Sequence, residues 1–414
     1  MIRSDAVFAN SFPQQALPRV IVIGAGLGGL CLAQGLRRAG IEVAVYERDA
    51  DSTARTQGHR LHIDQRGRDA LAKVLPPHLF SLLAAIVGRP APTVRGFDHQ
   101  LRPTGAFPLE DSPQRPVEDV MPAHTVLDRH VLRRILLTGL DDIVHYGREC
   151  VGYDSERGTV TARFADGGTA RGTILVGADG IGSVIRAQRL PHARVVDSRI
   201  RLVYGRVPFT SELREALPSA MFSVFNSVVG PDGRFVGIAP VEYHESPATA
   251  AARLAPEVTL DPTSNTLAVM FGRRSDRLGL SDRDLRAASG EDLRALVRAQ
   301  LAGGHPLVTT LVENWSRPSI FPVTVRSSVP VPPWPTSNVT LLGDAIHAMS
   351  PAAGAGANMA LRDGAALATA LATGHHLPAA VRDYELAMVE EGFRMVRLSA
   401  ANGTRTLGAD LLPG

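Results

Sequence analysis

The chain has 414 residues, which is long enough for two or more lobes with cores of their own. Its 44 % hydrophobic and 21 % charged residues are ordinary for a folded protein and exclude a chain that is disordered throughout. The 44 Lys and Arg residues are interspersed with 41 Asp and Glu residues, so the net charge of +3 forms no basic stripe and nucleic-acid binding is not expected.

The first predicted unit along the chain is a βαβ unit over residues 19–48. An apolar VIVIG leads through the turn GAGLGG into a helical stretch and a second apolar stretch, IEVAVYER. Gly24 permits the tight turn, Gly26 lets the backbone approach a pyrophosphate, and Gly29 allows the helix to pack closely on the strand. Glu47 ends the second strand, where a carboxylate can accept ribose hydroxyl groups. The unit predicts a dinucleotide site and does not distinguish FAD from NAD.

The middle of the chain predicts a second lobe. HRLHID indicates a short strand, and residues 89–116, rich in Pro and Gly, indicate loops with some strands. An amphipathic helix follows with Asp128 as its N-cap. A hairpin around DGG then leads into the buried strand ILVGADG, which delivers Asp179 to the carboxyl end of a sheet, where ligands collect. Four strand candidates in residues 199–271 are separated by turns, which favours an antiparallel sheet.

Near the C-terminus the sequence returns to an α/β pattern. A buried strand over residues 339–342 precedes Gly343 and Asp344, a loop of small residues, and a helix that begins near Ala357 and Asn358. The first N–H groups of such a helix have no intrahelical partner and carry partial positive charge. We therefore expect this helix to face a flat group that can become negatively charged, such as a reduced isoalloxazine.

Four motifs in this order resemble the single-component, FAD-dependent aromatic monooxygenases of the p-hydroxybenzoate hydroxylase fold. The motifs are GAGLGG with Glu47, an Arg-x-x-Leu-x-x-x-Leu helix from Arg129, GADGIGSVIR and GDAIHAMSPAAGAGAN. The resemblance implies an α/β fold, in which a Rossmann-like FAD-binding domain (GR2-type) carries an inserted antiparallel β-sheet substrate domain and C-terminal helices. It implies an FAD-binding domain of residues 18–88, 114–190 and 318–373, a substrate domain of residues 89–113 and 191–317, and a C-terminal helical segment of residues 374–414.

The resemblance also implies roles for single residues. Arg129 would reach the phosphate or ribityl region of FAD, Asp344 would bond the ribityl chain, and Asp179 would help to handle cofactor and nicotinamide. The loop before HRLHID lacks the glycine cluster usual in the family, so contacts of Arg55 and Arg60 with the cofactor do not follow from a motif. The complete set expected to bind FAD is Gly24, Gly26, Gly29, Glu47, Arg48, Arg60, Arg129, Asp179, Asp344, Gly356, Ala357 and Asn358.

The reaction that the resemblance implies is carried by the flavin. In this family NADH or NADPH reduces FAD, and a C4a-hydroperoxide formed with O2 transfers one oxygen atom to an electron-rich substrate. We expect hydroxylation, or oxidative rearrangement, of an aromatic or polyketide-like small molecule, with no metal. Pro351 either lies beside the peroxide as the candidate catalytic residue or merely turns the chain. The expected wall of the substrate pocket is Tyr204, Arg206, Phe222, Phe225 and Met270.

Several alternatives stay open. His62 and His347 either assist deprotonation of a phenol or simply pack. A flavin oxidase or reductase without oxygen insertion, or a non-catalytic FAD-binding protein, would share the same motifs. A halogenase is disfavoured, since Trp315 and Trp334 form no tryptophan-rich motif and the single lysine is Lys73, on a predicted helix.

The remaining expectations concern the compartment and assembly. The two cysteines form no Cys-x-x-Cys pair and indicate a reducing compartment. No stretch approaches the ~20 apolar residues of a membrane span. We expect a cytoplasmic monomer or small homo-oligomer that binds nicotinamide transiently, because there is no second Gly-x-Gly-x-x-Gly.

Overall fold

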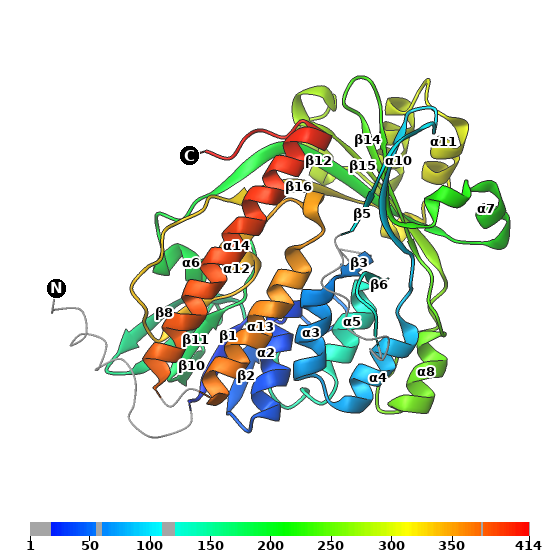
Figure 1. Cartoon of the computed structure of the whole chain (residues 1–414). Helices are drawn as coiled ribbons and strands as arrows, with labels where there is room; N and C mark the ends of the chain where they lie inside the picture. The colour runs from blue at the N-terminus through cyan, green and yellow to red at the C-terminus, as the bar shows by residue number, and fades with distance from the viewer. Residues whose placement is uncertain (1–17, 55–59, 110–120, 374–375, 414) are drawn as a thin grey trace.

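A computed structural model of the chain describes residues 18–54, 60–109, 121–373 and 376–413. Arg55 and residues 56–59, which lead into β3 (Arg60–Ile63), therefore lie outside the described residues. Residues 110–116, at the end of the predicted loop region 89–116, also lie outside them. Figure 1 shows two large sheets at opposite ends of the molecule, joined by long helices.

A five-stranded parallel sheet brings together strands from both ends of the chain. Its order is β17-β11-β1-β2-β7, and each neighbouring pair is parallel. The predicted βαβ unit is confirmed, since β1 and β2 pair directly with a helix between them. Strands β1, β11 and β17 are buried along their whole length, as their continuous apolar sequences require. The strands are β1 Val20–Ile23, β2 Val43–Tyr46, β7 Val144–His145, β11 Ile174–Gly177 and β17 Val339–Leu341.

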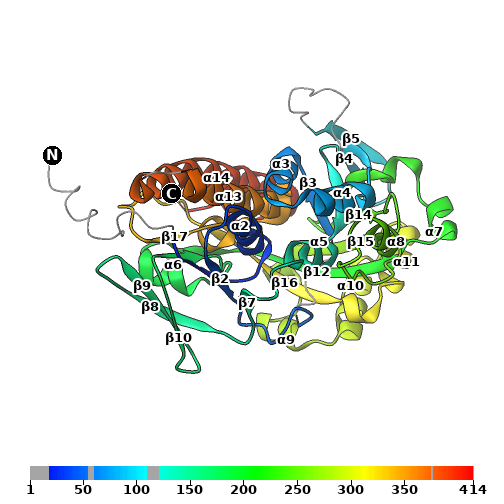
Figure 2. The same ribbon diagram turned by 90° about the horizontal axis from the view of Figure 1, so that it is seen from below.

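Helices cover one face of this sheet, and a small second sheet covers the other (Figure 2). Helix α2 (Leu27–Arg38) packs on α13 (Gly356–Thr373) through glycines, because a Cβ atom on Gly364 would lie 2.6 Å from the carbonyl oxygen of Gly28. The long helix α14 (Leu377–Leu407) lies beside α13. On the opposite face lies the predicted hairpin around DGG, which is confirmed as part of a three-stranded sheet of β8 Cys150–Glu156, β9 Thr159–Phe164 and β10 Thr169–Gly172.

The second large sheet has seven strands in the order β16-β12-β15-β14-β13-β4-β5. The antiparallel arrangement predicted for residues 199–271 is confirmed, because β12, β15, β14 and β13 pair antiparallel in turn. The one parallel pair joins β13 to β4. The strands are β4 Ala91–Asp98, β5 Pro103–Pro108, β12 Val195–Pro208, β13 Ser223–Val229, β14 Phe235–Val241, β15 Thr266–Arg274 and β16 Phe321–Ser328.

The division of the chain into domains stays a proposal, and one strand bears on it. Strand β16 falls in segment 318–373, which we assigned to the FAD-binding domain, yet it pairs with β12 as an edge of the seven-stranded sheet. The chain thus contributes to both sheets within this one segment before it enters β17.

The two faces of the seven-stranded sheet have different partners. Val203, Val269 and Phe271 face α10 (Gly290–Gln300) and α11 (Pro306–Glu313) in one buried cluster. The opposite face packs Ile200 and Leu202 against Leu407, the last residue of α14. This second face looks toward the parallel sheet. The other helices are α3 Gln65–Val74, α4 Pro77–Ile86, α5 Arg129–Leu137, α6 Val184–Arg189, α7 Ser211–Ala216, α8 Pro247–Leu254, α9 Asp282–Ala287 and α12 Asp344–His347.

A two-stranded ribbon lies between the large sheets. Strands β3 (Arg60–Ile63) and β6 (Thr125–Asp128) pair antiparallel, with Arg60 opposite Asp128. Asp128 caps α5, because its Oδ1 accepts a hydrogen bond from the N–H of His130 at 2.7 Å, as the sequence predicts. Among the helices that the structure describes, none is long and apolar enough to cross a membrane.

An ion-pair cluster at Arg201 anchors β12 to α9. The Arg201 side chain is 2 % exposed and donates hydrogen bonds to Asp197 and Asp282, at 2.7–2.8 Å. These bonds hold the pKa of Asp282 below its ordinary value and, against the opposing effect of burial, that of Asp197 as well. A depressed carboxyl pKa contributes stability that is present above the unfolded value of 3.8 and lost as the pH falls through the folded value.

We expect the double variant Asp197→Asn, Asp282→Asn to lower the free energy of unfolding by about 3 kcal/mol at neutral pH, because it leaves a buried guanidinium uncompensated. The exposed pair Arg382 and Asp383 provides the control, and Asp383→Asn should cost less than about 1 kcal/mol. Urea unfolding measures both. The difference between the double variant and the wild type should shrink below pH 3.8, and a constant difference down to about pH 2.5 would contradict the assignment.

Candidate functional site

The glycine turn after β1 has the three properties that its sequence predicts. Gly24 has φ +109°, and a Cβ atom there would lie 2.4 Å from the carbonyl oxygen of Ala178. A Cβ atom on Gly29 would lie 2.1 Å from the carbonyl oxygen of Gly24, so only glycine allows this helix to approach. A Cβ atom on Gly26 would meet nothing within 4 Å, so the turn is open on this side. The backbone in front of α2 can therefore be approached closely by a ligand.

Glu47 supports this turn from the next strand. It is 3 % exposed, and its Oε2 accepts a hydrogen bond from the N–H of Ala25 at 2.8 Å. Its Oε1 accepts a further bond from the N–H of Asp49 at 3.1 Å. The carboxylate thus lies beside the turn, where the dinucleotide reading places it, and its contact with a ribose stays a prediction. Arg48 is exposed next to it.

Arg133 is a functional candidate that the sequence reading missed. Its Nε donates to the carbonyl oxygen of Ala25 at 3.3 Å, and its Nη1 donates to that of Ser52 at 2.5 Å. The side chain is buried and ties the glycine turn to α5. The sequence could have indicated Arg133, because it follows Arg129 by four residues and therefore lies on the same face of the predicted helix.

Asp179 joins the GADGIGSVIR motif to the GAGLGG turn. A Cβ atom on Gly24 would lie 3.1 Å from the Cα of Asp179, so the two turns are in contact. The Oδ2 of Asp179 accepts a hydrogen bond from the N–H of Val184 at 2.8 Å, at the start of α6. Its Oδ1 is buried and lacks a hydrogen-bond partner in the described part of the chain, and burial raises the pKa of this carboxyl group. Buried acceptors are normally hydrogen-bonded, so this Asp179 oxygen suits a ligand that donates a hydrogen bond to it.

Asp344 meets Arg129 at the same edge of the sheet. Desolvation by the surrounding protein atoms raises the pKa of Asp344, and the positive charges of His347 and Arg129 oppose that rise, so Arg129 lies close by. The Asp344 side chain is nevertheless exposed, which leaves its carboxylate available to a ligand. A Cβ atom on Gly356 would lie 3.9 Å from the Asp344 Oδ1, so α13 begins beside this carboxylate.

The start of α13 is held by Asn358. This side chain is fully buried, and its Oδ1 accepts a hydrogen bond from the N–H of Asp64 at 3.1 Å. Its Nδ2 donates to the carbonyl oxygens of His62 at 2.9 Å and Gly354 at 3.3 Å. The amide group is thus engaged within the protein, and a ligand in front of α13 would contact backbone, as at Ala357, rather than this side chain. Pro351 lies exposed in the loop before the helix, and its role stays a prediction.

A buried His347–Asp363 pair fixes the turn that presents Asp344. The Nε2 of His347 lies 2.5 Å from the Oδ2 of Asp363, and the same oxygen accepts a hydrogen bond from the N–H of Gly343 at 3.0 Å. Burial disfavours the imidazolium, yet the carboxylate outweighs it and the pKa of His347 is raised. His347 is 1 % exposed, so it supports the packing alternative and not a contact with substrate.

His62 also fits the packing alternative. Burial and the charge of Arg60 lower the pKa of His62 to about 3, which makes it a weak base. Its Nε2 lies 3.0 Å from the Nδ1 of His124, and the two rings are stacked.

The candidate pocket residues divide between the two faces of the seven-stranded sheet. Tyr204 stacks on Phe321, and Met270 is its register partner. A Cβ atom on Gly237 would touch both Phe225 and Met270, at 2.8 and 2.9 Å, so these side chains share the face that looks toward the parallel sheet. Burial raises the pKa of Tyr204 to about 12, which keeps its hydroxyl group neutral.

The other two candidates have partners of their own. Arg206 binds Asp128, with its Nη1 2.9 Å from Oδ2, and so links the large sheet to the cap of α5. Phe222 stacks on Phe209 beneath the guanidinium of Arg214 and packs with the cluster on the opposite face. The structure therefore does not bring Phe222 together with Tyr204, Phe225 and Met270.

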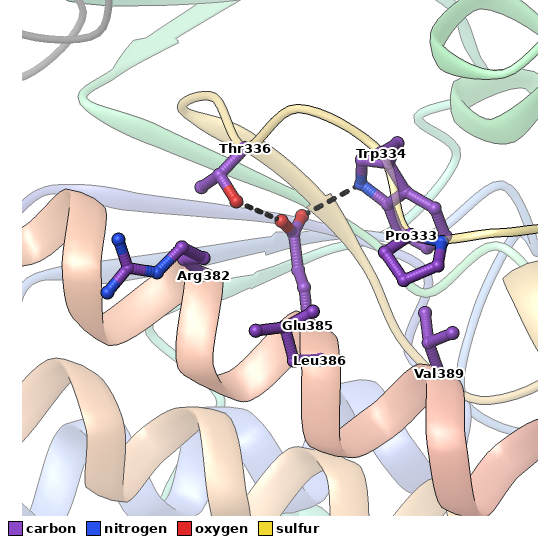
Figure 3. Close-up of a pocket in the computed structure, with 7 residues that line it drawn as sticks. All are labelled: Pro333, Trp334, Thr336, Arg382, Glu385, Leu386 and Val389. Carbon is purple, nitrogen blue, oxygen red and sulfur yellow. Dashed lines mark hydrogen bonds between the residues drawn. The ribbon is translucent and has the colours of Figure 1, made fainter. Parts of the chain in front are cut away.

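A small pocket on α14 is separate from this site (Figure 3). Its volume of about 20 Å³ suits about one water molecule. The adjacent Glu385 carboxylate accepts hydrogen bonds from Trp334, Thr336 and Thr340, so it is satisfied within the protein. This carboxylate is a structural link between α14 and the chain that leads into β17.

These contacts form a candidate nucleotide site at the carboxyl edge of the parallel sheet. Hydrogen bonds cross this edge from Gly24 to Tyr46, from Ala178 to Ile23 and from Leu342 to Gly177. The open turn at Gly26, the unpaired Asp179 oxygen and the exposed Asp344 carboxylate fit FAD, which needs a backbone cradle for its pyrophosphate and an acceptor for its ribityl hydroxyl groups.

Comparison with known proteins agrees with an FAD-binding protein. An FAD binding domain model matches residues 311–380, and an NAD(P)-binding Rossmann-like domain model matches residues 22–84. An FAD-dependent monooxygenase of Talaromyces islandicus is 30 % identical over 365 residues, covering 85 % of this chain and 82 % of the relative. The chain belongs to the FAD-dependent monooxygenases, as the resemblance of its four motifs implies.

Two further comparisons extend this finding. A dual O-methyltransferase/FAD-dependent monooxygenase of Phaeosphaeria nodorum is 34 % identical over 389 residues, covering 87 % of this chain and 41 % of that protein. The chain thus spans less than half of the length of that dual enzyme. A crystal structure from Photorhabdus luminescens subsp. laumondii, assigned as an FAD-containing monooxygenase, superposes with a TM-score of 0.79 at 29 % identity, covering 94 % of this chain and 98 % of the other.

The different surroundings of Gly26 and Gly29 allow a paired test. Gly26→Ala should leave the melting temperature of the apoprotein unchanged and weaken FAD binding at least about tenfold, which is about 1.4 kcal/mol, because the new methyl group enters only the space in front of the turn. Gly29→Ala should instead destabilise the fold itself, since its Cβ meets backbone. Calorimetry and titration with FAD measure the two effects. Unchanged FAD affinity in the Gly26→Ala variant would show that the pyrophosphate lies elsewhere.

Proposed function

We propose that this chain is an FAD-dependent monooxygenase that uses NADH or NADPH and O2 to hydroxylate, or oxidatively rearrange, an aromatic or polyketide-like small molecule. The observation that carries the proposal is the meeting of segments from both ends of the chain at one sheet edge. The open turn at Gly26 follows β1, and the carboxylate of Asp344 follows β17, beside the start of α13 and close to Arg129.

The chain's own residues would bind and orient the cofactor. The turn at Gly26 would hold the pyrophosphate, Glu47 the adenosine ribose, and Asp344 the ribityl chain. Bound FAD would supply electron transfer from nicotinamide and activation of O2, which no protein side chain provides. The unpaired N–H groups at the start of α13 would favour negative charge on the ring by about 0.3–1 kcal/mol.

The face of the seven-stranded sheet would form the substrate side. Phe225 and Met270 present apolar surface that excludes water, and Tyr204 presents a neutral hydroxyl group. The NAD(P)-binding model covers residues 22–84, which is the region of the same glycine turn, so it points to no second nucleotide domain. We therefore propose that nicotinamide binds only transiently.

The test is an oxygen-labelling experiment on the FAD-loaded protein. Phenols, naphthols and polycyclic quinones are screened for compounds that stimulate consumption of NADH or NADPH, and active compounds are then incubated under 18O2. We expect one 18O atom in the product by mass spectrometry. Stimulated consumption that yields only hydrogen peroxide would instead indicate an oxidase, and FAD binding without any consumption would indicate a non-catalytic flavoprotein.

A further inference from the structure

Arg60 reaches across from the central ribbon to the seven-stranded sheet. It is the first residue of β3, and its side chain is half-buried. Its Nε donates a hydrogen bond to the carbonyl oxygen of Pro240 at 3.2 Å, and its Nη2 donates to that of Val224. The guanidinium therefore lies against β13 and β14, and its expected contact with FAD stays a prediction.

The two carbonyl groups explain how Arg60 is held. The pairing of β13 with β14 ends where Asn226 faces Ile238. Continuing this register would set Val224 opposite Pro240, which has no N–H group to donate. Arg60 supplies donors at the end of the ladder, so two of its three nitrogens are fixed by backbone from two strands.

No carboxylate among the described residues pairs with the charge of Arg60. In the part of the chain that the structure describes, its hydrogen bonds go to carbonyl oxygens and its Nη1 makes none. Burial lowers the pKa of Arg60 to about 9, with no carboxylate raising it, and the group is still protonated at neutral pH. By contrast, Arg201 and Arg206 each bind a carboxylate. A partly desolvated cation without a counter-charge is costly unless an anion joins it.

The position of Arg60 indicates whether the cofactor or the substrate would supply this anion. Residues 60 and 62 of β3 lie on one face of the strand. The Nδ1 of His62 is 3.8 Å from the position of a Cβ on Gly354, in the loop before α13. On its other side, Arg60 contacts Val224, the neighbour of Phe225. Arg60 thus lies between the loop that precedes α13 and strand β13, which carries Phe225 of the proposed substrate side.

We propose that Arg60 binds an oxyanion carried by the aromatic substrate, either a carboxylate or a phenolate, through its free Nη1 edge. The proposal rests on the proposed function and deepens it, because it names the chemical class of the substrate. It also makes Arg60 a substrate-binding residue in place of a cofactor ligand. Arg206 does not compete for this role, since Asp128 already neutralises it.

The charge should act on the reacting ring as well as on affinity. A cation within about 4–6 Å lowers the pKa of a phenol by about 1–3 units. A phenolic substrate would then be bound as its electron-rich phenolate, which favours attack by an electrophilic oxygen. A carboxylate elsewhere on the ring would instead fix the orientation of the substrate.

The test uses the FAD-loaded protein and three probes of one shape. These are 2-naphthoate, 2-naphthol and the uncharged 2-naphthamide, and binding is followed by the change in flavin absorbance. We expect at least one of the first two to bind tenfold or more tightly than 2-naphthamide. A preference for 2-naphthoate identifies the carboxylate, and a phenolate absorption band of bound 2-naphthol at neutral pH identifies the phenolate.

The variants separate charge from structural support. Arg60→Gln keeps amide donors for the carbonyl oxygens and removes the charge, and Arg60→Lys keeps the charge. We expect the preference for the anion to fall below twofold in Arg60→Gln and to persist in Arg60→Lys. The control is Arg171→Gln, at an exposed position on β10, and it should behave as the wild type.

The failures of the two proposals are distinguishable. If the wild type holds FAD and consumes nicotinamide but binds neither anion more tightly than 2-naphthamide, the role of Arg60 is wrong and the proposed function stands. The same conclusion follows if Arg60→Gln melts within about 3 °C of the wild type and keeps the preference. A protein that does not take up FAD would overturn the proposed function itself.

Discussion

The parallel pairing of β1, β11 and β17 is the constraint on which the rest of the structure depends. These buried strands come from the beginning, the middle and the last quarter of the chain, and parallel pairing places all their carboxyl ends at one edge. Each strand leads into a tight turn: Gly24 follows β1 with φ +109°, Ala178 follows β11 and packs against Gly24, and Gly343 follows Leu342 after β17 with φ +58°. Charged and polar groups therefore collect at this edge without any of them being adjacent in the sequence.

The fold was predictable where the signal is local or where four motifs occur in a known order. The turn at Gly24, the cap at Asp128 and the helix start near Ala357 each depend on residues within a few positions, and the structure has all three. The sheet to which β16 belongs was harder to predict. Its sequence, FPVTVRSS, indicates a strand but not which sheet that strand joins. Its partner β12 is distant in the sequence, and only the packed structure decides the pairing.

The site was predictable in its backbone and less so in its side chains. Glycine positions follow from sterics, but the direction of a long side chain depends on what surrounds it. Arg60 was expected to bind FAD, a role that stays a prediction, and its guanidinium lies on the seven-stranded sheet. Phe222 packs with a different cluster from Phe225 and Met270. The His347–Asp363 pair joins two residues that contact each other only once α13 is packed.

Helix α14 has a mechanical consequence. Near its start, Tyr384 donates to the carbonyl oxygen of Leu341 at 2.9 Å and Glu385 binds Thr340, both on β17, while Leu407 at its end packs on β12 (Figure 1). One rigid rod thus braces both sheets, and they cannot swing apart without breaking buried contacts at one end of it. Any ligand that enters or leaves the space between the two sheets must then rely on rearrangement of short connecting segments, not on a hinge between two halves.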